Sequence, residues 1–318
     1  MESSHHGPLR GPLVSVILPV YNRAGWVARA VESVLTQTHR PLELLVVDDG
    51  STDDTRRVLE EFGARITVHA QAHAGAEAAR NLGLKHARGQ FVAFIDSDDF
   101  WYEDRLSRQL PLFERPEVGV VFGNAVLVDY RAAEKLRLRQ TFFDRVRPSR
   151  GRVTGELARG CFLPFSSVIV RRELLAGAGG FTRGRVAADY LKWVEMSVGC
   201  EFDYVETPVF EYAIHAGGLS HDLVETLEDR IEAFKEMLAR NTDGKLDAVL
   251  RRILFNLALS LRVARARRGL ESARAPFVPA ATRGERLSWS LKFARDQLMT
   301  RGRWWFTRMR RRSGWWKG

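Results

Sequence analysis

The sequence predicts an α/β fold with a mainly parallel central sheet, followed by a C-terminal helical extension. Between residues 13 and 128, short runs of β-branched residues alternate with amphipathic segments, which is the pattern of β-α-β units in a parallel sheet. From residue 223 onward, nearly the whole sequence has the apolar period of a helix. These patterns predict a flexible N-terminus at residues 1–12, an α/β domain at 13–222 and a helical region at 223–318.

The predicted strands of the α/β domain are short apolar runs rich in β-branched residues. The first five are expected at Val14–Leu18, Leu42–Val47, Ile66–Val68, Phe91–Ile95 and Val118–Phe122. Amphipathic segments between them predict helices at Trp26–Leu35, from the N-cap candidates Asp53 and Asp54 through Phe62, and at Ala76–His86. Strand and helix therefore alternate through this part of the chain.

After Val128 the pattern is mixed, and this part is expected to form the second wall of a cleft. An arginine-rich connection runs through Arg152. It precedes predicted strands at Ser166–Val170, Phe202–Val205 and Val209–Ile214 and a helix around Ala187–Val198. The helical region is expected to hold helices at Leu223–Arg240, Lys245–Ala266 and, after the break at Ala275–Pro279, Glu285–Arg312.

Composition narrows the class of protein. The two cysteines, Cys161 and Cys200, give no sign of a disulfide framework in a chain of this size, which favours a reducing, cytoplasmic location. Residues 1–12 contain no apolar core of signal-peptide length. No uncharged apolar run reaches the roughly 18 residues that span a bilayer. Any membrane contact is therefore expected to be peripheral, on the cytosolic face.

The net charge of +10 is concentrated at the C-terminus, where Arg301–Lys317 contains no acidic residue and half of the chain's tryptophans. Arginines interleaved with tryptophans are typical of segments that lie on an anionic membrane surface. The alternative is that the tryptophans pack on the α/β domain while the arginines stay solvated. Single-stranded nucleic acid is also bound by such a composition, but nothing in the α/β domain supports it, and no nucleic acid is expected.

Acidic residues follow two of the predicted strands. Asp96, Asp98 and Asp99 come after the strand that ends at Ile95, and Asp48 and Asp49 come after the strand that ends at Val47. Ligands of open α/β sheets bind beyond the carboxyl ends of the strands, so both clusters are expected to face one cleft. Neighbouring carboxylates repel one another unless a cation is present, and a hard divalent ion also binds phosphate oxygens. The first hypothesis is a metal-bound diphosphate, and the alternative is a solvated turn.

Taken together, these motifs resemble the inverting nucleotide-sugar glycosyltransferases of family 2, which have the GT-A fold. The resemblance covers roughly Val14 to Ser220. It rests on Val14–Asn22, on Asp48–Thr55, and on the stretch that contains Gly75, Ala79–Leu84, Gly89 and Phe94–Asp99. It implies a metal-dependent, inverting transfer of a sugar from a nucleoside diphosphate sugar, most commonly a UDP-sugar. The implied acceptor is a hydroxyl of a glycan or of a lipid-linked molecule in polysaccharide or glycoconjugate biosynthesis.

The resemblance also implies the residues that bind the nucleotide. They are Pro19, Tyr21, Asn22, Asp48, Asp49, Arg80, Asp96 and Ser97. Tyr21 is expected to pack on the base, and Asp49 to accept a hydrogen bond from it, since a carboxylate accepts from a ring N–H. Three alternatives stay open: Tyr21 as an amphipathic lid on the first strand, Asp48 as a cap of the strand turn, and Arg80 as a surface ion-pair partner.

By the same resemblance, Asp98 ligates the Mg²⁺ or Mn²⁺ ion that bridges the diphosphate, and His215 completes the metal site or contacts the diphosphate. A structural role at the strand end is the alternative for His215. Asp189 is the implied catalytic base, and a helix N-cap is compatible with it. Ala188 stands where the family usually has an acid, which puts any acceptor contact of that acid in question.

Asp99 and Trp193 are assigned to the acceptor side of the cleft, and the alternative for Asp99 is that it holds the loop. The competing interpretation of the whole chain is a non-catalytic nucleotide-sugar or membrane-binding module that retains the fold. The joint presence of Asp49, Asp96, Asp98 and Asp189 favours an enzyme, because a degenerate domain has no chemical reason to keep all four.

Overall fold

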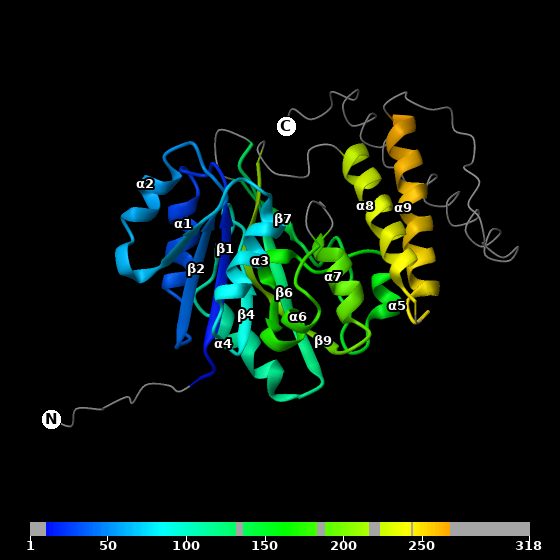
Figure 1. Cartoon of the computed structure of the whole chain (residues 1–318), viewed down its shortest axis with the longest axis horizontal. Helices are drawn as coiled ribbons and strands as arrows, with labels where there is room; N and C mark the ends of the chain where they lie inside the picture. Colours follow the sequence, from blue (N-terminus) through cyan, green and yellow to red (C-terminus); the bar gives the residue numbers. More distant parts are fainter. Residues whose placement is uncertain (1–10, 132–135, 183–187, 216–222, 243, 268–318) are drawn as a thin grey trace, which may run out of the picture. The chain divides into compact units, whose positions relative to one another are not determined.

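The computed structural model describes residues 11–131, 136–182, 188–215, 223–242 and 244–267, which fall within one compact unit, Met1–Ser272. The strands are β1 (Val14–Val20), β2 (Leu42–Asp48), β3 (Thr67–Ala70), β4 (Phe91–Phe94), β5 (Phe100–Trp101), β6 (Val118–Asp129), β7 (Leu136–Thr141), β8 (Ile169–Arg171) and β9 (Glu201–Ile214). The helices are α1 (Val27–Leu35), α2 (Thr55–Glu60), α3 (Ala76–His86), α4 (Arg105–Gln109), α5 (Thr154–Leu157), α6 (Arg172–Gly177), α7 (Ala188–Met196), α8 (Leu223–Arg240) and α9 (Asp247–Arg267). Figure 1 shows their arrangement.

The strands form one sheet in the order β3-β2-β1-β4-β8-β6-β9-β5, with β7 paired to β6. The pairs β3–β2, β2–β1 and β1–β4 are parallel, and so is β6–β9, whereas β8 runs antiparallel to both of its neighbours. The predicted α/β fold is thus confirmed, with a parallel first half and a mixed second half. The parallel half brings the carboxyl ends of β1, β2 and β4 to the same edge.

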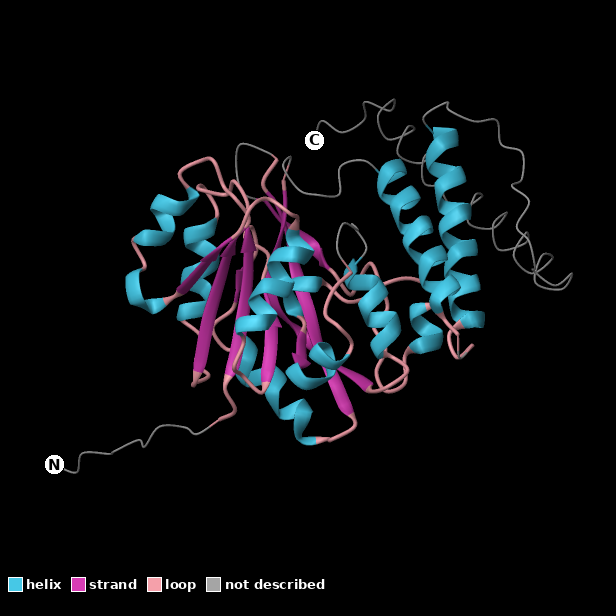
Figure 2. Cartoon of the chain, viewed as in Figure 1, coloured by secondary structure: helices cyan, strands magenta, loops and turns pink. Residues whose placement is uncertain are grey.

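Helices cover both faces of the sheet (Figure 2), and a hydrophobic core lies on each face. Along β1, Val16 and Leu18 pack on one side with α1, while Ile17 packs on the other, because successive strand residues point to opposite faces. The helix α3 approaches β1 closely: a Cβ added at Gly83 would lie 2.6 Å from a methyl carbon of Ile17. Glycine at this position therefore lets α3 bring its first turn to the edge where β1 and β4 end.

The predicted elements of residues 13–128 are present with small changes in their ends. Downstream, the two strands predicted at Phe202–Val205 and Val209–Ile214 form the single strand β9, whose pairing with β6 shifts at Pro208, since proline cannot donate to the ladder. The strand predicted at Ser166–Val170 begins as a 3₁₀ turn over Phe165–Ser167, and only its last part pairs in β8. The strand β7 lies in the arginine-rich connection, where no strand was predicted.

The helices α8 and α9 pack against each other and against α5 and α7. The ring of Phe234 on α8 meets that of Tyr190 on α7 edge to face, at a centroid distance of 4.9 Å. The side-chain amide of Asn256 on α9 donates to the carbonyl of Ala158, 2.9 Å away. Among the described helices, none is long and apolar enough to cross a membrane. The predicted helix at residues 285–312 and the tail at 301–317 lie outside the described residues, and the predicted domain boundaries stay predictions.

Candidate active site

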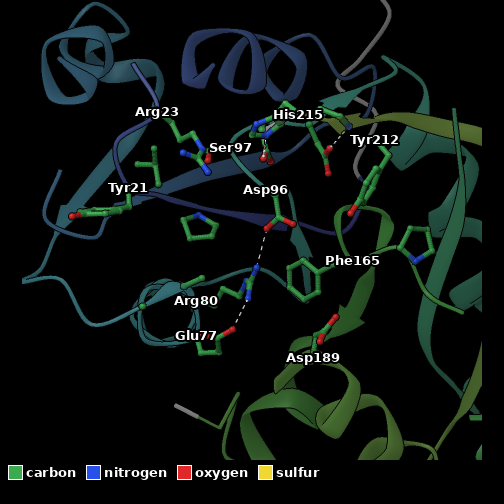
Figure 3. A pocket seen from close by; sticks show the side chains of 18 of the residues that line it. Tyr21, Arg23, Glu77, Arg80, Asp96, Ser97, Phe165, Asp189, Tyr212 and His215 are labelled. Atoms are coloured by element: carbon green, nitrogen blue, oxygen red, sulfur yellow. Dashed lines mark hydrogen bonds and ion pairs between the residues drawn. The ribbon is translucent and has the colours of Figure 1, made fainter. Parts of the chain in front are cut away.

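A cleft of about 1290 Å³ opens where β1, β2, β4 and β9 end, beside the start of α7. Figure 3 shows the side chains that face it. Eleven of the predicted site residues line it: Pro19, Tyr21, Asn22, Asp49, Arg80, Asp96, Ser97, Asp98, Asp99, Asp189 and His215. The structure therefore brings together side chains that the sequence spreads over almost 200 positions.

Asn22 connects the turn after β1 to the loop after β2. Its backbone has a φ of 50°, a left-handed conformation that asparagine tolerates better than most residues. The Oδ1 atom of Asn22 accepts hydrogen bonds from the backbone N–H groups of Thr52, at 2.8 Å, and Asp53, at 3.3 Å. The Oγ atom of Ser51 accepts a bond from the Asn22 N–H at 3.0 Å. Asn22 thus fixes the two motif loops to each other at the mouth of the cleft.

Tyr21 presents its ring at the edge of the cleft, where the residue is 39% exposed. One face of the ring stacks on the imidazole of His73, with centroids 4.0 Å apart and planes inclined by 25°. Because stacked rings at this distance are in contact, no base fits between them. A base that packs on this face of Tyr21 must first displace His73.

Asp49 is buried and organises the loop that carries His73. Its carboxylate accepts hydrogen bonds from the Gln71 side chain at 2.7 Å and from the backbone N–H groups of Ala74 and Gly75, both at 2.9 Å. The Nδ1 atom of His73 lies 2.9 Å from Oδ2 of the same carboxylate. Three hydrogen-bond donors and the adjacent imidazole surround this carboxylate, so a base that binds to Asp49 must replace the side chain of Gln71 or His73.

Asp48 does not line the cleft and is fully buried. It accepts a hydrogen bond from the Ser51 N–H at 2.9 Å and forms an ion pair with Nε of Arg56 at 2.5 Å. Burial alone would raise the pKa of Asp48, but the bonds from Ser51 and Arg56 outweigh it and hold the pKa below its usual value. Of the two predicted roles, this geometry agrees with the cap of the strand turn and places no nucleotide contact here.

Trp193, assigned to the acceptor side, also lies away from the cleft. It is fully buried on α7, and its ring meets that of Phe181 edge to face at a centroid distance of 6.0 Å. The large apolar ring is therefore part of the hydrophobic core, where it fixes α7 beneath the cleft.

Arg80 and Asp96 form an ion pair at the centre of the cleft (Figure 3), with a distance of 2.9 Å between Nη2 and Oδ1. The other guanidinium nitrogen lies 3.3 Å from Oε1 of Glu77, and the group lies over the ring of Phe165, 4.1 Å from its centroid. Burial raises the pKa of Asp96, the charge of Arg80 opposes this, and the charges of Asp98 and Asp189 add to it. Arg80 is thus an internal partner of the acidic cluster, not a surface ion-pair residue.

Asp98 meets His215, the last described residue before the gap at 216–222. The two atoms Oδ2 of Asp98 and Nε2 of His215 are 2.7 Å apart. The imidazole also stacks on Trp26, with centroids 4.7 Å apart. Next to this pair, Asp99 accepts a hydrogen bond from the Ala213 N–H at 3.0 Å. Burial, then the charges of Asp98 and Asp96, raise the pKa of Asp99 well above its usual value.

The donor set fits a divalent ion that is shared with a substrate. In the described part of the chain, no three His, Cys, Asp or Glu side chains converge as a metal site. Asp98 and His215 offer one carboxylate and one imidazole. Mn²⁺ binds both kinds of ligand, whereas Mg²⁺ prefers the carboxylate. Such ions complete their coordination with phosphate oxygens and water. A cation here would also reduce the mutual repulsion of the three carboxylates at positions 96, 98 and 99.

Asp189 lies in the first turn of α7, and its half-buried carboxylate faces the cleft. Its Oδ1 atom accepts a hydrogen bond from the Tyr190 N–H at 2.7 Å, so the carboxylate bonds one N–H group of the first helical turn as well as facing the cleft. Burial raises the pKa values of Glu77 and Asp96, and the charge of Asp189 adds to both increases. Figure 3 shows Asp189 on the other side of the Arg80–Asp96 pair from Tyr21.

Among the cleft residues that the sequence does not predict are the titratable side chains of His73, Glu77 and Arg230. His73 and Glu77 lie two residues before and after Gly75, inside the segment that carries the motifs. Their position next to Gly75 could therefore have identified them as cleft residues. Arg230 lies on α8, outside that segment. Its place in the sequence predicts a helix but gives no sign that this helix reaches the cleft.

Comparisons with known proteins agree with this geometry. Residues 15–175 match the family model described as Glycosyl transferase family 2. The chain is 41% identical over 119 residues to the Escherichia coli UDP-Glc:alpha-D-GlcNAc-diphosphoundecaprenol beta-1,3-glucosyltransferase WfgD, covering 37% of this chain and 47% of WfgD. It is 47% identical over 103 residues to the putative teichuronic acid biosynthesis glycosyltransferase TuaG of Bacillus subtilis, covering 31% of this chain and 41% of TuaG. Each match therefore spans less than half of the relative.

Two solved structures share the fold. S. aureus TarS 1-349 in complex with UDP-GlcNAc superimposes with a TM-score of 0.62 at 22% identity, covering 80% of this chain and 74% of TarS 1-349. The mannosyltransferase PcManGT from Pyrobaculum calidifontis, in complex with GDP-Man and Mn²⁺, superimposes with a TM-score of 0.61 at 22% identity. This match covers 94% of this chain and 84% of PcManGT. These similarities confirm the predicted GT-A fold.

Proposed function

The chain belongs to glycosyl transferase family 2, and from this premise we propose that it transfers a sugar from a nucleoside diphosphate sugar to an acceptor hydroxyl with inversion. The observation that carries the proposal is the single cleft in which Tyr21, the Asp98–His215 pair and Asp189 meet. An aromatic ring, two ligands for a divalent ion and a carboxylate are the parts that this reaction needs. The complexes of TarS with UDP-GlcNAc and of PcManGT with GDP-Man support a nucleotide-sugar donor.

The nucleotide end of the cleft is built by β1, β2 and the loop that Asp49 holds. Tyr21 contacts the base once His73 moves aside, and Asp49 accepts from the base in place of a side-chain donor. Arg80 and Asp96 lie between this end and Asp189, where they face ribose or diphosphate. A uridine nucleotide is the donor we propose, and the name of WfgD, which specifies UDP-Glc, supports it.

Asp98 and His215 would hold the divalent ion, Mn²⁺ or Mg²⁺. When bound, that ion neutralises the charge that develops on the departing nucleoside diphosphate. The protein's own contribution is to hold the two ligands in place: Trp26 stacks on His215, and Asp99 fixes the end of β9 next to Asp98. The Mn²⁺ of PcManGT supports the choice of ion.

Asp189 acts as the general base. Inversion requires the acceptor hydroxyl to attack the anomeric carbon from the side opposite the leaving diphosphate, and the hydroxyl loses its proton as it approaches. The carboxylate of Asp189 takes that proton while the bond from the anomeric carbon to the diphosphate breaks. The position of Asp189 across the Arg80–Asp96 pair from Tyr21 supports this role.

The acceptor we propose is a glycan or lipid-linked molecule of cell-surface polysaccharide biosynthesis. The names of WfgD, which specifies a diphosphoundecaprenol-linked acceptor, and of TuaG, which specifies teichuronic acid biosynthesis, support this class. An enzyme that extends such an acceptor would work at the cytosolic membrane face.

A thermal-shift screen tests the donor part of the proposal. The purified chain is heated with UDP- and GDP-sugars in the presence of Mn²⁺, Mg²⁺ or a chelator. A ligand that binds the folded state alone raises the melting temperature, so we expect a shift with one nucleotide class that the chelator removes. A folded protein that no nucleotide sugar stabilises, with either metal, contradicts the proposal.

A further inference from the structure

Among the residues that the structure describes, Arg230 is a cleft cation without a protein partner. It lies on α8, beyond the residues 15–175 that match the family model, and it lines the same cleft as Asp189. Within the described ranges, no residue makes a hydrogen bond or ion pair with it, and its Nε atom is buried and unbonded. The other cleft arginines are engaged: Arg80 with Glu77 and Asp96, Arg131 with Asp129, and Arg23 with the carbonyl of Asn22.

The packing of α8 on α7 places Arg230 on the same side of the cleft as Asp189. Phe234, one helical turn after Arg230, meets Tyr190, the residue that follows Asp189, at a centroid distance of 4.9 Å. Cys161 also lines the cleft. Burial raises the pKa of its thiol, the charge of Asp189 adds to this rise, and the charge of Arg230 opposes it. The carboxylate and the guanidinium thus both lie close to one thiol, away from the nucleotide end at Tyr21.

We propose that Arg230 binds an oxyanion of the acceptor, so that the acceptor carries a phosphate or carboxylate group near the hydroxyl that receives the sugar. A guanidinium matches both groups with two parallel hydrogen bonds, and a partly buried cation without a counter-charge is unfavourable until an anion arrives. The inference rests on the proposed function, because it takes the Asp189 side of the cleft to be the acceptor side.

The acceptor itself is not needed for the test, because soluble anions can report on the site. The chain is first saturated with UDP or GDP and Mn²⁺, so that the donor side is filled. It is then titrated by calorimetry with three probes: geranyl diphosphate for a phosphate group, methyl glucuronoside for a carboxylate, and methyl glucoside as the uncharged control. We expect one anionic probe to bind and the uncharged probe to bind at least tenfold more weakly.

Three variants assign the binding to Arg230. Arg230→Ala is expected to weaken binding of the anionic probe by about tenfold or more. Arg230→Lys keeps the charge but loses the paired donors, so it should weaken this binding less. Arg240→Ala removes the same charge from an exposed position of the same helix and should leave the affinity unchanged. Nucleotide binding with Mn²⁺ and the melting temperature show whether each variant is folded.

The outcomes separate this inference from the function it rests on. A wild-type chain that binds no nucleotide with Mn²⁺ contradicts the proposed function and the inference together. A chain that binds the nucleotide but neither anionic probe overturns the inference alone. Equal affinity of a folded Arg230→Ala variant and the wild type for the anionic probe also overturns it. Whether geranyl diphosphate or methyl glucuronoside binds more tightly identifies the phosphate or the carboxylate as the group on the acceptor.

Discussion

Nε2 of His215 lies 2.7 Å from Oδ2 of Asp98, although the two residues are 117 positions apart in the sequence. Asp98 follows β4, whereas His215 follows β9, at the far side of the sheet order. The contact depends on Asp99, which accepts a hydrogen bond from the Ala213 N–H near the end of β9. Asp99 therefore positions the end of β9, and its neighbour Asp98 contacts His215, which follows that strand end.

We predict that Asp98→Ala and His215→Ala remove the metal dependence of nucleotide binding. Each substitution deletes one of the two donors that the chain offers to the ion, so an ion held by the phosphate oxygens is no longer fixed to the protein by both ligands. Calorimetric titration with UDP and GDP, with Mn²⁺ and with chelator, measures the effect. Asp54→Ala is the matched control, since this carboxylate is exposed outside the cleft. An unchanged gain in affinity on adding Mn²⁺ to either cleft variant would remove that residue from the metal site.

We predict that Asp48→Asn lowers the free energy of unfolding at pH 7 by about 1–3 kcal/mol. The neutral amide loses the ion pair with Arg56 and weakens the hydrogen bond from the Ser51 N–H at a buried position. The folded-state pKa of Asp48 lies below its usual value of 3.8. Its charge therefore contributes stability above that value, and the contribution is lost as the pH falls through the folded-state pKa. The unfolding free energies of wild type and variant, measured by urea unfolding, should differ at pH 7, and this difference should shrink as the pH falls below about 4. A difference that persists unchanged in acid would contradict the ion-pair role.

We predict that His73→Ala tightens nucleotide binding. The His73 ring covers one face of Tyr21 and fills an acceptor site of Asp49, so the base competes with it for both. A stacked aromatic pair contributes about 0.5–1.5 kcal/mol, which corresponds to roughly two- to tenfold in the dissociation constant. Tyr21→Ala should weaken the same binding, since the base loses its platform. Weaker binding by His73→Ala would mean that the imidazole contacts the base instead of blocking it.

The sequence predicts best what short segments determine by themselves. The strands β1, β2 and β4 are predictable because their apolar runs are continuous and buried on both faces of the sheet. The turns that follow them hold Tyr21, Asp49 and Asp96, so the edge of the sheet at which these side chains meet follows from the parallel arrangement. Asp189 was predicted from a family motif at a helix start, and it lies there.

Long-range packing accounts for what the sequence does not predict. The strand β7 alternates leucine with arginine over Leu136–Arg139 only, and this short signal in an arginine-rich, exposed connection was not recognised as a strand. Asp48 and Asp49 are identical in type and adjacent, and only the tertiary fold decides that Asp48 pairs with Arg56 inside while Asp49 faces the cleft. Trp193 was assigned to the site because it follows Asp189 in the family motif, but its ring packs into the hydrophobic core. Arg230 reaches the cleft because Phe234 packs on Tyr190, a contact between segments that no local pattern connects.

The most direct test of the account is the rate of sugar transfer by Asp189→Asn at saturating donor. Release of the nucleoside diphosphate is measured with the donor that the thermal-shift screen selects, with Mn²⁺, and with water or an added glycan as acceptor. Asparagine keeps the size of the side chain but cannot take a proton, so we expect the rate to fall by about 10²- to 10⁴-fold with donor affinity unchanged. Asp104→Asn, which changes a half-buried carboxylate outside the cleft, should retain the wild-type rate. An Asp189→Asn variant that transfers sugar at the wild-type rate would contradict the account, because the cleft would then hold no base at this position.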